Sequence, residues 1–259
     1  METRFVESPD GTRIAYEVDG YGPPLVLLHG ALSQDRHSWR ETGYVEKLRR
    51  SFTVFTPDLR GHGESPCPPD PGRFHLDRLL EDVLAVADAE GADRFRLWGF
   101  SFGATIGMRL AVRTNRVKRA VLGGAFFGPV FTPAYEERTR AVFREVDRAR
   151  SEGVAIGADL SPNERWLAES GLYPLARSLF LAMSAWPPVE PREVKCPMFL
   201  YAGAEFKTAA DAYARDAEAM RAAGVEWRVW AGLDHMAEFS RIDVTFDEAF
   251  AFLHQAGEP

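Results

Sequence analysis

Gly99-Phe100-Ser101-Phe102-Gly103 follows the apolar run Phe95 to Trp98 and precedes a helix-like segment, Ala104 to Val112. This order predicts a strand, a sharp turn that carries a serine, and a helix. Glycines two residues before and two residues after Ser101 permit a tight turn and a close approach of the helix to the strand. The turn would lift the Ser101 hydroxyl above the sheet edge, where the positive end of the helix dipole points at it.

Three further motifs each follow a run of residues that predicts a strand. They are His29-Gly30-Ala31 after Leu25 to Leu28, Asp58 to Ser65 after Phe52 to Phe55, and Gly232-Leu233-Asp234-His235 after Glu226 to Trp230. Strands that alternate with helices favour an α/β fold with a mostly parallel sheet. With all four motifs in this order, the chain resembles the α/β-hydrolase superfamily over residues 3 to 255. The resemblance implies an α/β-hydrolase fold, in which helices flank the sheet and a small helical cap is inserted.

The expected cap is the segment from Gly128 to Pro191, where the alternation of strands and helices stops. Thr132-Pro133 and Ser161-Pro162-Asn163-Glu164 have the residues typical of helix N-termini. We therefore predict a core formed by residues 1–127 and 192–259, with residues 128–191 inserted as a helical cap.

Composition excludes several classes of protein. The formal net charge is −7 over 259 residues and no basic cluster occurs, so nucleic-acid binding is not expected. No apolar run approaches the ~20 residues that span a bilayer, and the N-terminus lacks the pattern of a signal peptide, so we expect a cytoplasmic protein. No His/Cys spacing indicates a metal site and no G-x-G-x-x-G follows a strand, so no cofactor is expected. The expected partner is a small-molecule ester, bound by a monomer or homodimer.

Two residues are predicted to carry the chemistry. Serine needs a general base to accept its proton, and donors to stabilise the oxyanion that forms on the substrate. Ser101 is the predicted nucleophile, and His235, in the loop after the last strand, is the predicted base. The backbone amide of Phe102 would supply one oxyanion donor. The resemblance assigns the second donor to the amide of Ala31.

The usual catalytic acid is missing from its position. Relatives usually carry Asp three residues after the glycine that ends the strand corresponding to Met198–Ala202. That glycine is Gly203, and Phe206 occupies the Asp position. Glu205, one residue earlier, is the predicted acid. Asp211, a carboxylate of the cap, or a Ser–His dyad without an acid remain alternatives.

Aromatic residues are predicted to line a substrate pocket between the Ser101 turn and the cap. The substrate-binding prediction comprises Phe126, Phe127, Trp166, Phe180, Trp186 and Phe206. Related enzymes that open epoxides or displace halide have Asp where this chain has Ser101, so serine favours an acyl-enzyme and hydrolysis of carboxylic esters with apolar or aromatic groups. Lactone or C–C bond hydrolysis at the same site is an alternative. A ligand-binding protein that has lost turnover is another.

Overall fold

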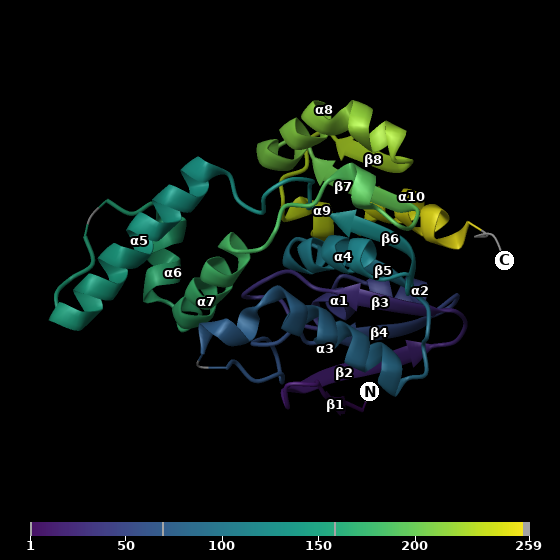
Figure 1. Ribbon diagram of the computed structural model, residues 1–259, viewed down its shortest axis with the longest axis horizontal. Coiled ribbons are helices and arrows are strands. Elements are labelled where there is room, and N and C mark those ends of the chain that lie inside the picture. Colours follow the sequence, from purple (N-terminus) through teal and green to yellow (C-terminus); the bar gives the residue numbers. More distant parts are fainter. Residues whose placement is uncertain (1, 69, 158, 256–259) are drawn as a thin grey trace.

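A single eight-stranded sheet forms the centre of the computed structural model, which describes residues 2–68, 70–157 and 159–255. Residues 1, 69 and 256–259 of the predicted core, and residue 158 of the predicted cap, lie outside the described residues. The strands are β1 (Arg4–Glu7), β2 (Arg13–Gly20), β3 (Pro24–Leu28), β4 (Thr53–Pro57), β5 (Phe95–Phe100), β6 (Val117–Gly123), β7 (Met198–Gly203) and β8 (Val225–Trp230). Their order in the sheet is β1-β2-β4-β3-β5-β6-β7-β8 (Figure 1). Of the eight strands, β2 runs antiparallel to the other seven, so the predicted mostly parallel α/β sheet is confirmed.

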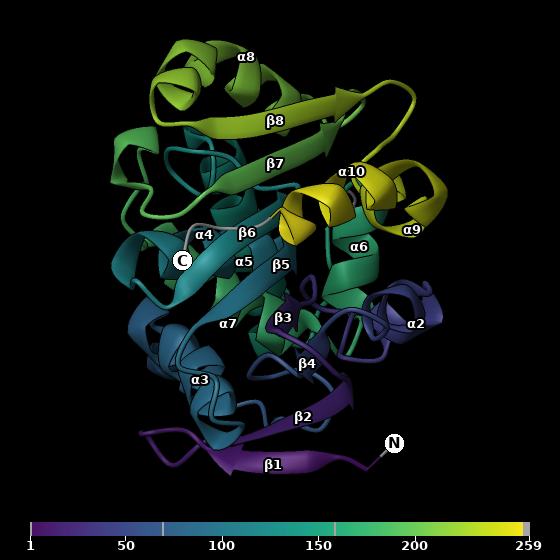
Figure 2. The same ribbon diagram turned by 90° about the vertical axis from the view of Figure 1, so that its right-hand side faces the viewer.

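Helices cover both faces of the sheet. They are α1 (Ser38–Glu41), α2 (Tyr44–Leu48), α3 (Leu76–Ala89), α4 (Phe102–Arg113), α8 (Lys207–Ala222), α9 (Ala237–Ser240) and α10 (Ile242–His254). In Figure 2, α3 and α8 lie on one side of the sheet and α2, α9 and α10 on the other. In β3, Val26 and Leu28 join the core beneath α3, α4 and α8, whereas Leu25 and Leu27 join the core beneath α1, α2, α9 and α10. Successive side chains of a strand point to opposite faces. A strand covered on both faces therefore has an uninterrupted apolar sequence.

Three helices between β6 and β7 project away from the sheet (Figure 1). We call α5 (Pro133–Glu152), α6 (Pro162–Glu169) and α7 (Tyr173–Ser184) the cap helices. The predicted helix starts are confirmed: the Thr132 hydroxyl accepts the Tyr135 amide at 3.3 Å, and Ser161 forms a capping box with Glu164. At the base of the insertion, the Gly128 amide donates to the Val189 carbonyl at 2.7 Å.

The carboxyl ends of β5, β6, β7 and β8 meet at one edge of the sheet, because all four strands run parallel. The loops that follow these strands therefore lie together, beside the cap helices. Within the described residues, we find no helix with the length and apolar character needed to cross a membrane.

Candidate active site

The turn between β5 and α4 holds Ser101 in a strained conformation. Its φ is 52° and its ψ is −111°, in a region that non-glycine residues rarely adopt. The Ser101 amide donates to the Gly123 carbonyl at 2.7 Å, which ties the turn to β6. A Cβ on Gly103 would lie 2.2 Å from the Leu28 carbonyl oxygen, and one on Gly99 would lie 2.7 Å from backbone atoms of Ala104. Both glycines are therefore required for this close packing.

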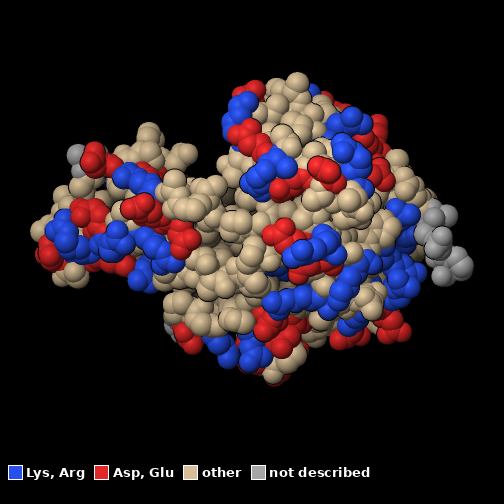
Figure 3. Space-filling view, turned by 45° about the horizontal axis from the view of Figure 1, so that its top comes forward, with Lys and Arg blue, Asp and Glu red and all other residues tan. Residues whose placement is uncertain are grey.

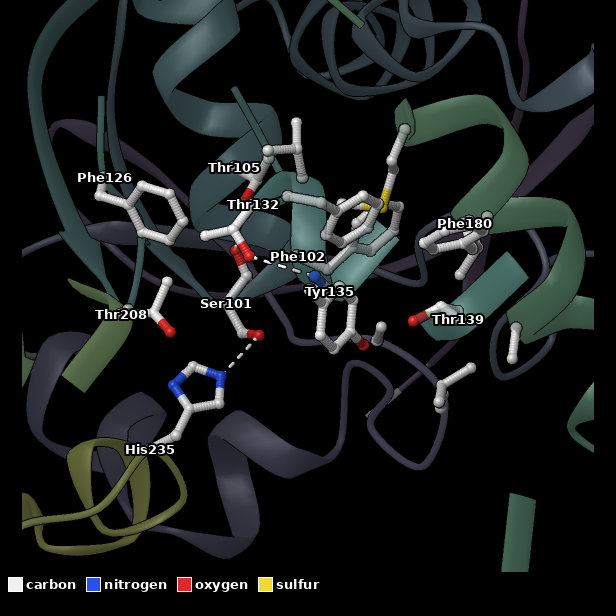
Figure 4. Close-up of a pocket in the computed structure, with 18 of the residues that line it drawn as sticks. Ser101, Phe102, Thr105, Phe126, Thr132, Tyr135, Thr139, Phe180, Thr208 and His235 are labelled. Carbon is white, nitrogen blue, oxygen red and sulfur yellow. Dashed lines mark hydrogen bonds between the residues drawn. The ribbon is translucent and has the colours of Figure 1, made fainter. Parts of the chain in front are cut away.

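His235 lies in the loop after β8 and faces Ser101. Its Nε2 is 2.8 Å from the Ser101 Oγ (Figure 4). Two phenylalanine rings pack against the imidazole, Phe100 with a centroid separation of 5.0 Å and Phe206 with one of 4.3 Å. The structure thus brings together the predicted nucleophile and the predicted base, and aromatic contacts restrict the orientation of the base.

The other imidazole nitrogen contacts a carboxylate that the sequence analysis missed. His235 Nδ1 is 3.0 Å from Oε2 of Glu238, on the short helix α9. Glu238 is fully buried, and its Oε1 accepts the Gly203 amide at 2.8 Å. Burial raises the pKa of this carboxyl above its ordinary value, while the hydrogen bond with His235 acts in the opposite direction. Ser101, His235 and Glu238 therefore form one continuous hydrogen-bonded chain.

The prediction that Glu205 supplies the acid is corrected by this geometry. Glu205 is exposed, and the Nδ1 atom that it was expected to contact lies beside Glu238 instead. Phe206, at the usual Asp position, packs its ring on His235. The sequence contained a signal, because residues three apart on a helical turn lie on one face, and His235 and Glu238 have this spacing.

The loop after β3 lies beside the Ser101 turn. Ala31 and Phe102, the predicted sources of the oxyanion donors, both line the cavity next to Ser101. The Gly103 amide donates to the His29 carbonyl at 3.0 Å, which joins this loop to the start of α4. Leu32, with a φ of 65°, and Ser101 are the two non-glycine residues with positive φ in the described part of the chain. Backbone strain is thus concentrated on the two segments that flank the cavity.

Two buried histidines connect the same loop to the segment that follows β4. His29 Nε2 accepts the Leu59 amide at 3.0 Å, and His62 Nε2 accepts the Leu32 amide at 2.9 Å. A nitrogen that accepts an amide proton carries none, so both rings are held neutral. Burial lowers the pKa of His29 to about 3 and also lowers the pKa of His62. These histidines are therefore structural supports of the loop that contains Ala31.

A cavity of about 410 Å³ lies between Ser101 and the cap helices. Of the predicted lining residues, Phe126, Phe180 and Phe206 line it. The other three predicted residues do not line the cavity, and each lies in a different environment. Phe127 is buried in the core, Trp166 is exposed on α6, and Trp186 is buried with its ring stacked on Phe102.

The described lining of this cavity contains no Lys, Arg, Asp or Glu. Its polar groups are the hydroxyls of Ser101, Thr105, Thr132, Tyr135, Thr139 and Thr208 and the imidazole of His235. The surface where the cap helices meet the core is likewise mainly uncharged, whereas charged side chains gather farther out on both sides (Figure 3). The cavity therefore offers apolar contacts and neutral hydrogen-bonding groups.

Comparison with known proteins places this chain in a family. A family model described as the alpha/beta hydrolase fold matches residues 23–153, just over half of the chain. The chain therefore belongs to the alpha/beta hydrolase fold family. A hydrolase from Pseudomonas aeruginosa has a similar solved structure, with a TM-score of 0.72 and 26% identity over 98% of this chain and 99% of that chain.

Two curated relatives catalyse different reactions, according to their names. Haloalkane dehalogenase 2 of Mycobacterium tuberculosis is 33% identical over 143 residues, which cover 55% of this chain and 48% of that protein. Pyrrolizixenacetamide deacetylase of Xenorhabdus hominickii is 33% identical over 116 residues, which cover 44% and 42%. The chain spans about half the length of the curated relatives it matches. Because these relatives are named for different reactions, we infer the reaction of this chain from the geometry of its site.

Proposed function

We propose that this chain is a serine hydrolase that cleaves carboxylic esters of small, uncharged, apolar or aromatic substrates through an acyl-enzyme. The observation that carries the proposal is the hydrogen-bonded chain of Ser101, His235 and Glu238 at the wall of an uncharged cavity. A nucleophile in contact with a base, which is itself oriented by a third group, is the arrangement that activates serine.

In the first half-reaction, Ser101 Oγ attacks the ester carbonyl while His235 Nε2 accepts its proton. The amides of Ala31 and Phe102 stabilise the oxyanion of the tetrahedral intermediate. His235 then protonates the alcohol oxygen as the C–O bond breaks, which leaves an ester between the acyl group and Ser101. In the second half-reaction, His235 takes a proton from water, the resulting hydroxide attacks the acyl-enzyme, and the proton returns to Ser101 as the acid leaves.

Glu238 acts through His235 and is a positioning residue. Its Oε2 accepts the Nδ1 proton, so Nε2 is left free of a proton and directed at Ser101. The carboxylate also stabilises the imidazolium that forms during each half-reaction. The Gly203 amide and the burial of Glu238 hold the carboxylate in place.

The nucleophile argues against halide displacement as the reaction of this chain. In haloalkane dehalogenases a carboxylate must displace the halide to form an alkyl ester, whereas this chain has Ser101 at the corresponding turn. A serine ether formed by such a displacement would have no carbonyl for water to attack. We also propose that residues 128–191 act as the cap that closes the substrate cavity over Ser101.

Labelling of the active serine tests this function directly. Wild-type protein should react stoichiometrically with a fluorophosphonate probe and should hydrolyse 4-nitrophenyl butyrate with multiple turnovers. Ser101→Ala should abolish both reactions, and His235→Gln should slow both by ~10³-fold or more. Ser151→Ala, which removes an exposed hydroxyl from α5, is the matched control and should leave both unchanged. A folded wild-type protein that neither labels nor hydrolyses would instead be a non-catalytic binding protein.

A further inference from the structure

The two long cap helices present chemically different walls to the cavity. One side is lined by Thr132, the N-cap residue of α5, and by Tyr135, Thr139 and Phe143 of α5, which recur every three or four residues. On α7, the lining residues are Ala176, Leu179, Phe180 and Met183. Side chains at these spacings share one face of a helix. One wall therefore carries a row of hydroxyls, and the facing wall is entirely apolar.

Two hydroxyls of the polar wall are available to a ligand. The Thr132 hydroxyl accepts the Tyr135 amide, and the Thr105 hydroxyl donates to the Ser101 carbonyl. The hydroxyls of Tyr135 and Thr139 have no hydrogen-bond partner in the part of the chain that the structure describes. Both side chains lie around the cavity near Phe180 in Figure 4. A substrate placed between α5 and α7 thus meets two uncommitted, uncharged hydrogen-bonding groups.

The same end of the cavity is aromatic. The Phe180 ring lies 5.0 Å from that of Phe131 and 5.4 Å from that of Phe143, measured between centroids. Aromatic rings favour such stacked and edge-to-face neighbours. A cavity of about 410 Å³ also has the size of a site for a small molecule. An aromatic ring is the group that fits this end best.

The acyl part of the ester is the part that reaches this end. His235 must protonate the leaving oxygen, so the alcohol part lies on the His235 side of Ser101. Figure 4 shows Tyr135, Thr139 and Phe180 on the other side of Ser101 from His235. The acyl group, which remains bonded to Ser101, therefore extends toward α5 and α7.

We propose that the preferred substrates are esters whose acyl group is an uncharged aromatic ring that bears a neutral hydrogen-bonding substituent, such as a phenolic hydroxyl. The ring packs against Phe180, and its substituent bonds to Tyr135 and Thr139. The inference rests on the proposed function and specifies the substrate class of that same site. A carboxylate on the ring is disfavoured, because the described lining contains no cation and Arg140, which lies 5.6 Å from the Phe180 ring centroid, is paired with Glu136.

Three ethyl esters with a common leaving group test the proposal: ethyl 3-phenylpropanoate, its 4-hydroxyphenyl analogue and its 4-carboxyphenyl analogue. Each net hydrogen bond to a neutral group favours binding by roughly 2- to 12-fold, so two bonds predict a kcat/KM ratio of hydroxyphenyl to phenyl ester of at least about 5. The carboxyphenyl ester should be slower than the phenyl ester. Tyr135→Phe combined with Thr139→Val should reduce the first ratio to about 1.

Two controls separate this inference from the proposed function. Tyr21→Phe, a matched change at an exposed residue outside the cavity, should leave the ratio at its wild-type value. In Ser101→Ala, calorimetry with 3-phenylpropanamide and 3-(4-hydroxyphenyl)propanamide should show the same preference without turnover. An active enzyme with a ratio near 1, or a ratio unaffected by the double variant, would overturn the substrate class alone. Absence of both phosphonylation and turnover would overturn the proposed function and this inference with it.

Discussion

The loops after β7 and β8 differ in what they contribute to the site. In relatives, the acid usually lies on the loop after β7. The loop after β7 has Phe206 at the usual position of the acid and leaves Glu205 exposed. The loop after β8 and the α9 turn supply both His235 and its carboxylate partner, Glu238. The β7 loop still contributes the Gly203 amide, which holds Glu238, and the Phe206 ring, which packs on His235. The carboxylate that contacts Nδ1 therefore comes from the segment after β8, although the β7 loop still helps to hold it.

The largest expected effect is the difference in kcat between substitutions of Glu238 and of Glu205. Glu238→Gln should lower kcat by ~10⁴-fold with little change in KM, because loss of the acid function in a serine protease triad costs about that much. Glu205→Gln should leave both constants within about twofold of wild type. Steady-state kinetics with 4-nitrophenyl butyrate, on variants that unfold cooperatively, provides the measurement. Equal losses in the two variants would contradict the assignment of Glu238.

Restoring the usual acid position should partly reverse that loss. In the Glu238→Gln background, Phe206→Asp places a carboxylate on the residue that packs against His235, and kcat should rise by ~10²-fold. Phe206→Asn in the same background adds no charge and should give no such gain. A pH–rate profile of both double variants identifies the charged form as the source of the rescue. Identical kinetics for the Asp and Asn variants would show that a carboxylate at position 206 does not interact with His235.

A smaller effect is expected from the loop after β6, which packs against both partners. A Cβ on Gly124 would lie 2.5 Å from His235 Cε1 and 2.8 Å from Glu238 Oε2. Gly124→Ala should therefore displace the imidazole and lower kcat by about 10²-fold, since small displacements in an active site have effects of this size. Gly91→Ala is the matched control, because Gly91 also has a positive φ but nothing lies within 4 Å of its added Cβ. If both variants retain full activity, the packing at Gly124 does not constrain the pair.

The difference between the two loops also explains which site residues could be predicted from the sequence. The Ser101 turn and the His235 loop were predictable, because each directly follows a predicted strand and the glycines required by the turn are local in sequence. Glu238 was not predicted, since its role depends on how α9 packs against Gly203 and Gly124, which are distant in the chain. The prediction that Trp166 and Trp186 line the cavity was wrong for a related reason. Aromatic composition places residues in the cap segment but does not decide which of their side chains face the cavity.

The last and smallest effect concerns stability. Burial raises the pKa of Glu238 in the folded protein, so the folded state binds this proton more tightly than the unfolded state. Its contribution to stability is fully present below the unfolded pKa, near 4.5, and is lost as the pH rises through the folded pKa. Glu238→Gln keeps a neutral side chain at every pH. The variant should therefore gain stability relative to wild type between pH 4 and pH 7 while it loses activity.

Urea unfolding of both proteins across this pH range measures the difference. Glu205→Gln, at the exposed residue of the other loop, should show no pH-dependent difference from wild type. A Glu238→Gln variant that loses stability relative to wild type as the pH rises would mean that the bonds from His235 and Gly203 outweigh the desolvation of the carboxylate. In that case the β8 loop would stabilise the fold as well as orient the base. If the predicted sign is observed, the buried carboxylate is retained at the expense of stability, which is expected of a group whose role is to orient His235.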